Sequence, residues 1–143
     1  MRIIDANLLI YAYDKDAPQH ALAKAWLEDV YKNDDLVGLP RLVLLAFLRI
    51  STNPRIMNTP IKTEIAMEIV ENLVAHAKTV VVDCGPNHWK VFRDLVVRSG
   101  VYGPSITDAF LASLAIEHGA TLCSCDAGFR RYAELSLEIP KVS

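Results

Sequence analysis

Short apolar runs alternate with longer helix-like segments along the whole chain, and this alternation limits the folds open to it. We expect strands at residues 3–4, 36–39, 79–83 and 121–125, and a weaker one at 137–139. Helices are predicted between them, including the segment 41–50, which is apolar almost all round. This order predicts an α/β domain with a mostly parallel sheet of four or five strands.

The chain is predicted to form a single domain over residues 1–143, because no linker-like or low-complexity stretch divides it. Hydrophobic residues make up 52% of the sequence, which is enough for a core at this length. No apolar run approaches the ~18 residues that a membrane span needs, and no signal-peptide pattern opens the chain. The cysteines number three and have no framework spacing. We therefore expect a cytoplasmic protein with reduced thiols and no membrane association.

Aspartates follow the predicted strands at several places. Asp5, Asp83 and Asp126 each come directly after one, and Asp108 lies in the first turn of the helix before the fourth strand. Taken singly, each has an ordinary explanation as a helix cap or a partner for the helix dipole. Parallel strands end at one edge of their sheet, and binding sites form there. We therefore expect these acids to converge, where they repel one another unless a cation is present.

A carboxylate cluster suits a hard divalent cation, which takes oxygen ligands and keeps several waters. Such an ion lowers the pKa of bound water and stabilises charge on phosphate oxygens, so the cluster suits phosphodiester hydrolysis. The net charge of −2 provides no general basic surface, so nucleic acid would be held by a local patch or through metal. Arg49, Arg55, Arg130 and Arg131 flank the acids in sequence. These arginines either contact RNA phosphates or are solvated surface charges and partners for the acids, and the sequence favours neither role.

Three segments around these acids carry a resemblance to a known family. They are 4–7 (IDAN), 107–112 (TDAFLA) and 124–129 (SCDAGF), and they resemble the acidic motifs of PIN-domain ribonucleases. The segment 39–54, with LP at its start and RISTNP at its end, is similar to one branch of the VapC toxins of bacterial toxin–antitoxin pairs. The resemblance covers nearly the whole chain, in order.

The resemblance implies a three-layer α/β/α sandwich and an endoribonuclease that depends on Mg²⁺ or Mn²⁺. It also implies a homodimer and a cognate antitoxin whose tail blocks the site. By position, Asp5 and Asp108 would be metal ligands, and Asp126 would be a further ligand, directly or through water. Asn7 and Ser124 would support them by hydrogen bonds, since the period of two in a strand puts Ser124 on the same face as Asp126.

The sequence departs from the family pattern in one helix. PIN ribonucleases usually have a glutamate in the helix after the second strand, and we expect Phe47 to occupy that place here. No acid occurs between residues 36 and 63, so the site is one carboxylate short and the case for a second metal is weaker. Position 128, often acidic in the family, is Gly128. Asp83 is not expected to substitute, because its strand lies at the sheet edge in the family topology.

Other functions were weighed against this one. A non-catalytic PIN-like module that binds RNA or protein is the main alternative, motivated by Phe47. A receiver-like domain phosphorylated on Asp5 would need a late lysine at a strand end, and Lys141 follows Pro140 in the tail. Cys123 and Cys125 do not predict zinc, because a closed site needs four ligands.

Overall fold

Five parallel strands form the centre of the computed structural model, which describes residues 1–34 and 36–143. Their order across the sheet is β3-β2-β1-β4-β5, and every pairing is parallel. The predicted sheet is thereby confirmed, and the observed bounds shift by one or two residues. They are β1 Arg2–Ile4, β2 Val37–Pro40, β3 Thr79–Val82, β4 Thr121–Cys123 and β5 Ser136–Glu138.

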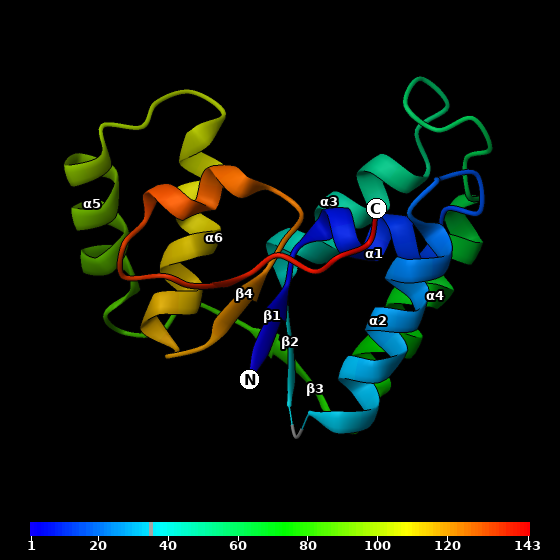
Figure 1. Ribbon diagram of the computed structural model, residues 1–143, viewed down its shortest axis with the longest axis horizontal. Coiled ribbons are helices and arrows are strands. Elements are labelled where there is room, and N and C mark those ends of the chain that lie inside the picture. The colour runs from blue at the N-terminus through cyan, green and yellow to red at the C-terminus, as the bar shows by residue number, and fades with distance from the viewer. Residues whose placement is uncertain (35) are drawn as a thin grey trace.

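Helices cover both faces of the sheet, which gives the three-layer α/β/α sandwich (Figure 1). Helices α1 to α4 lie on one side, and α5 and α6 lie on the other. The strand order explains this division, because the right-handed crossovers from β1 to β2 and from β2 to β3 run in one direction and the return from β3 to β4 runs in the other. The helices are α1 Ala6–Tyr13, α2 His20–Asn33, α3 Arg41–Ser51, α4 Thr63–Ala75, α5 His88–Ser99 and α6 Ser105–Glu117, with a short 3₁₀ helix η1 at Ala127–Arg131.

The core is densest around β1 and its two neighbours. Ile3, Ile4, Leu39 and Leu122 have no exposed surface, because the sheet interior is covered by helices on both faces. Helix α3 is less deeply buried than its sequence suggests, since Leu45 is 63% exposed. No helix in residues 1–34 and 36–143 is both long and apolar enough to cross a membrane.

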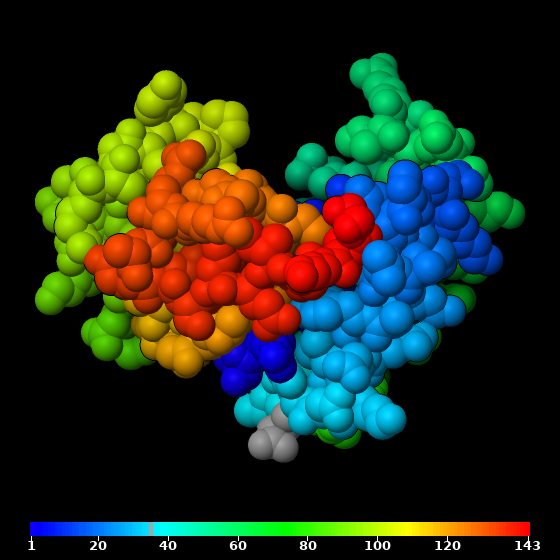
Figure 2. Space-filling view, in the orientation of Figure 1, coloured from blue at the N-terminus to red at the C-terminus, as the bar shows by residue number. Residues whose placement is uncertain are grey.

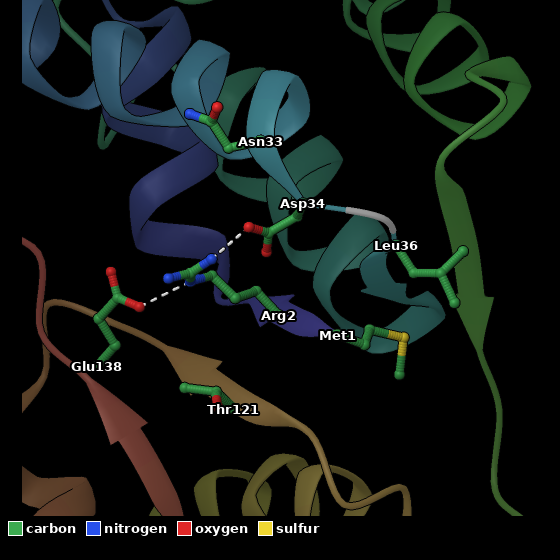
Figure 3. Close-up of a pocket in the computed structure, with 7 residues that line it drawn as sticks. All are labelled: Met1, Arg2, Asn33, Asp34, Leu36, Thr121 and Glu138. Atoms are coloured by element: carbon green, nitrogen blue, oxygen red, sulfur yellow. Dashed lines mark hydrogen bonds and ion pairs between the residues drawn. The ribbon is translucent and has the colours of Figure 1, made fainter.

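Arg2 ties three elements together where the central strands begin (Figure 3). Its Nε donates to Glu138 of β5 at 2.8 Å, and its Nη1 pairs with Asp34, just after α2. These acids hold the pKa of the guanidinium above its usual range, chiefly through the hydrogen bonds from the arginine. The pocket of about 610 Å³ around Arg2 is therefore lined by a cation whose charge is already compensated. We assign this cluster a structural role.

Candidate metal-binding and catalytic site

Asp5 lies at the junction between β1 and α1. Its backbone is extended, and its side-chain Oδ1 accepts the N–H of Ala6 at 2.7 Å, so Asp5 is the N-cap of α1. Its own N–H donates to the carbonyl of Cys123 at 2.9 Å, which continues the pairing of β1 with β4. The carboxylate is therefore fixed to the sheet on one side and to a helix on the other.

Ser124 is the centre of a hydrogen-bond network beneath Asp5. Its hydroxyl has no exposed surface and donates to Asp5 Oδ2 at 2.7 Å. The hydroxyl oxygen of Ser124 in turn accepts from Asn7 Nδ2 at 3.1 Å and from the N–H of Asp126 at 3.0 Å. Asn7 also receives the N–H of Cys125 on its Oδ1 at 3.3 Å. Both supporting residues expected from the sequence thus contact the segments that carry Asp5 and Asp126.

Asp108 and Asp126 approach Asp5 from two further elements. Asp108 lies in the first turn of α6 and lines the same pocket as Asp5. Asp126 follows β4, is exposed, and accepts the N–H of Gly128 on its Oδ1 at 2.7 Å. A Cβ at position 128 would lie 2.9 Å from that oxygen, so a side chain there would crowd the carboxylate.

The electrostatics of the three acids reflect their proximity. Burial is the largest cause that raises the pKa of Asp5, and the charges of Asp108 and Asp126 raise it further. The Ser124 hydroxyl and the Ala6 amide act in the opposite direction. Burial also raises the pKa of Asp108, followed by the charge of Asp126, while Arg131 lowers it. A nearby cation would relieve this repulsion.

The donor set fits a hard divalent cation that keeps part of its water shell. Among residues 1–34 and 36–143, none of the three acids has an ion-pair partner within 4.0 Å. The described side chains also include no group of three His, Cys, Asp or Glu residues gathered closely enough to hold a metal by themselves. Mg²⁺ is commonly bound by one or two carboxylates together with waters and substrate phosphates. Asp5 and Asp108 fit that description, and Asp126 fits a further contact, directly or through water.

The expectation that Phe47 of α3 takes the place of the family's glutamate beside the acids was wrong. Phe47 has no exposed surface, and its ring packs edge-on against Tyr13 at 5.7 Å in the core. Ala46, one residue earlier, lines the pocket with Asp5 and Asp108 instead. Successive helix residues point about 100° apart, so an error of one position moves a side chain from the site to the core. The conclusion that α3 supplies no carboxylate to the site still follows, since the helix contains no acid.

A pocket of about 340 Å³ adjoins the acids at the strand-end edge of the sheet. Its walls come from α3 and from the start of α6. Figure 2 shows the surface notched at this edge, between the segment before α6 (yellow-green) and the segment after α3 (teal). Sequence reasoning had proposed Arg49 near the acids and had missed the pocket itself. The available signal was the spacing of Leu42, Leu45, Ala46 and Arg49, which places them on one face of a helix.

The remaining candidates, Asp83 and Cys123, have other surroundings for their side chains. Asp83 follows the edge strand β3 and pairs with Arg41, which lowers the pKa of its exposed carboxyl. Cys123 is buried, and burial raises the pKa of its thiol to about 12, so the thiol is protonated at neutral pH. These residues therefore have structural explanations.

The fold is a parallel α/β sandwich with Asp5 and Asp126 at the carboxyl ends of neighbouring strands, the edge at which such sheets bind their ligands. The PIN-domain family model matches residues 2–135 of the chain. The chain is 36% identical to VapC ribonuclease Mb2897 of Mycobacterium bovis over 140 residues, covering 98% of this chain and 95% of that protein. It is 33% identical to ribonuclease VapC31 of Mycobacterium tuberculosis, covering 94% and 95%. The chain belongs to the PIN-domain family, in its VapC branch.

Solved structures agree on the fold. The chain is similar to VapBC2 of Rickettsia felis, solved bound to a promoter DNA fragment, with a TM-score of 0.69, 21% identity and 96% coverage of each chain. It is also similar to VapC20 of Mycobacterium tuberculosis, described as a sarcin–ricin loop cleaving toxin, with a TM-score of 0.69 and 13% identity. That likeness covers 98% of this chain and 99% of VapC20.

Proposed function

We propose that the protein is an endoribonuclease dependent on Mg²⁺ or Mn²⁺ and that it acts as the toxin of a type II toxin–antitoxin pair. One observation carries the chemistry: Asp5, Asp108 and Asp126 lie close enough for their charges to interact, and none of them has an ion-pair partner within 4.0 Å among the described residues. The ribonuclease names of the VapC relatives supply the substrate class.

In this proposal, Asp5 and Asp108 would hold the ion, and Asp126 would be a further ligand, directly or through water. The ion would supply a water of lowered pKa and stabilise negative charge on the phosphate oxygens. Ser124 favours the ionised form of Asp5 and orients it, because its hydroxyl donates to Oδ2 while the Ala6 N–H donates to Oδ1. Asn7 fixes the Ser124 oxygen, and the Asp126 amide on the same oxygen sets the start of the segment that carries Asp126.

The proposed partners are RNA, a cognate antitoxin and a second copy of the chain in the cytoplasm. VapBC complexes among the similar structures support the antitoxin, because those toxins are solved with theirs. Large apolar side chains on and near α5 support a protein partner, since Trp89 is 70% exposed, Val97 66% and Tyr102 84%. Light scattering of the isolated chain tests the dimer.

The activity is tested by RNA cleavage in Mg²⁺ or Mn²⁺, with and without a chelator. We expect Asp5→Asn to abolish cleavage that the parent performs, because the variant loses a ligand charge while keeping the size of the side chain. Asp16→Asn is the matched control, since Asp16 is exposed in the turn between α1 and α2. Equal cleavage by the parent and Asp5→Asn would refute the role of Asp5.

A non-catalytic module that binds RNA or protein is the second candidate. The absence of any acid from α3 favours it, together with the lack of a compact set of three ligands among the described side chains. Calorimetry with Mg²⁺ and Mn²⁺ separates the two candidates. Measurable metal binding accompanied by cleavage supports the nuclease, whereas no binding and no cleavage support the module.

A further inference from the structure

The pocket beside the acids has two kinds of wall. Asp5 and Asp108 form one, and the other is apolar, built by Leu42, Leu45 and Ala46 of α3. Leu111 of α6, only 4% exposed, closes the apolar part from the opposite side. The apolar part therefore sits directly against the place where the proposed reaction occurs.

Two polar groups lie at the rim of this apolar surface. Arg49 extends from α3 and Thr107 from the first turn of α6, and both are exposed. Within residues 1–34 and 36–143, Arg49 has no acid within 4.0 Å, so its charge is available to a ligand. The pocket thus offers an apolar surface, one cation and one hydroxyl next to two carboxylates.

We propose that this pocket receives one unstacked nucleobase of the RNA, from the nucleotide next to the phosphodiester that is cut. The inference rests on the proposed ribonuclease function, because the position of the acids fixes where the reacting phosphate lies. Single-stranded RNA is recognised by splaying a base out, covering its faces and bonding its edge. The pocket of about 340 Å³ is at the small end of the ligand pockets, ~300–1,000 Å³, which suits a single base.

The polar groups favour a nucleotide over a peptide side chain. A base has donors and acceptors on its edge for Thr107, and its phosphates match the charge of Arg49. An apolar side chain of a partner protein would bury the surface of Leu45 equally well. It would gain nothing from Arg49 and Thr107, which are exposed and would stay hydrated at the rim. Ala46 lines this wall with a short side chain, so a longer side chain there would reduce the volume of the pocket.

The test uses a synthetic oligoribonucleotide that spans one site mapped first by cleavage of total RNA in Mg²⁺ or Mn²⁺. Abasic nucleotides replace each position in turn. We expect an abasic substitution at one position next to the cut to lower the kcat/KM of the parent by about tenfold, and substitutions at distant positions to have little effect. Ala46→Leu fills the pocket with a residue that is nearly as good a helix former as alanine. This variant should cleave the intact RNA about as slowly as the parent cleaves the RNA with the abasic nucleotide. The abasic substitution should not lower the kcat/KM of the variant any further.

Ala21→Leu, on the exposed face of α2, is the matched control and should behave as the parent does. Thr107→Val is a second variant for the case in which Ala46→Leu fails to fold, and it should reduce the preference among bases at the same position. A uniform response to abasic substitution, or an Ala46→Leu variant with the parent's cleavage pattern, would overturn the pocket assignment. An Ala46→Leu variant that keeps the parent's cleavage pattern but binds the antitoxin more weakly would assign the pocket to protein instead. Absence of any metal-dependent cleavage by the parent would refute the ribonuclease proposal itself.

Discussion

Ser124→Ala is the substitution that tests the geometry of the site most directly. The hydroxyl of Ser124 has no exposed surface, and it serves Asp5, Asn7 and Asp126 at distances of 2.7, 3.1 and 3.0 Å. Alanine removes the one donor to Asp5 Oδ2 among these contacts and the acceptor of the other two groups. Almost nothing else changes, because the two side chains differ by a single oxygen.

The expected cost at pH 7.5 without metal is about 3 kcal/mol of unfolding free energy. A hydrogen bond to a charged group is worth ~1.5–3 kcal/mol, and a buried donor left without an acceptor adds to that. The Asp126 amide adds little, since Asp126 is exposed and water can replace the serine oxygen. Asn7 can turn its amide fully toward Asp5, to which its Nδ2 is already 3.4 Å away, and this also limits the loss.

The cost should depend on pH in a defined direction. The folded-state pKa of Asp5 lies above the unfolded value, chiefly because of burial, so ionised Asp5 opposes folding. The Ser124 hydroxyl reduces that opposition, and the variant should have a still higher pKa. The difference in unfolding free energy between parent and variant is therefore largest at pH values above the folded-state pKa of Asp5 in the variant. It should fall to about 1 kcal/mol, the value of a neutral hydrogen bond, as the pH drops through the folded pKa values.

Urea unfolding followed by circular dichroism, in EDTA between pH 4.5 and 8, measures this dependence. Thr52→Val is the control, because its half-buried hydroxyl donates at 2.7 Å to the Leu48 carbonyl, a group that does not titrate. That hydroxyl bonds to the backbone rather than to any of the three acids, so the cost of losing it should not follow their titration. A cost for Ser124→Ala that stays constant with pH would refute the claim that this hydroxyl stabilises an ionised Asp5.

Three further outcomes are expected. Asp108→Asn should raise the melting temperature in EDTA by about 2 °C or less, because solvent screens much of the repulsion, and should remove the stabilisation that Mg²⁺ gives the parent; a variant that Mg²⁺ still stabilises equally would contradict this. Arg2→Ala should cost about 1 kcal/mol in urea unfolding and less in high salt, since its ion pairs are partly exposed; a loss unaffected by salt would point to packing instead. Gly38→Ala should cost about 1–3 kcal/mol in the same assay, because its Cβ would lie 2.8 Å from Cγ1 of Ile3; an unchanged midpoint would show that Ile3 yields freely.

The fold was largely predictable from the sequence because each strand is a short apolar run between turn residues. The parallel sheet, its five strands and the separate helices follow from that alternation. The ends of strands were less predictable, since hydrogen-bond pairing rather than composition ends them. The strand predicted for 121–125 stops at Cys123, because Ser124 and Cys125 turn toward Asp5 and Asn7.

The sequence predicts the site residues that follow strands. It does not predict those on α3, because the rotation of the helix about its axis determines which of its residues face the site. Asp5 and Asp126 follow neighbouring strands, so topology alone brings them close. On α3, the choice between Phe47 and Ala46 depended on which face of the helix meets the sheet, and an apolar sequence on both faces does not reveal it. The pocket remained unseen for the same reason.

The position of β4 between β1 and β5 has a consequence for the order in which the protein becomes functional. While the chain is being synthesised, residues 1–82 can complete β3, β2 and β1, and β1 then stands at an open edge with unpaired backbone groups. The edge closes only when residues 121–123 pair with it, and that pairing also delivers Ser124 and Asp126 to Asp5. A nascent chain thus lacks the proposed metal site until residues 121–126 arrive, and a chain that stops before them is prone to aggregate through the open edge of β1.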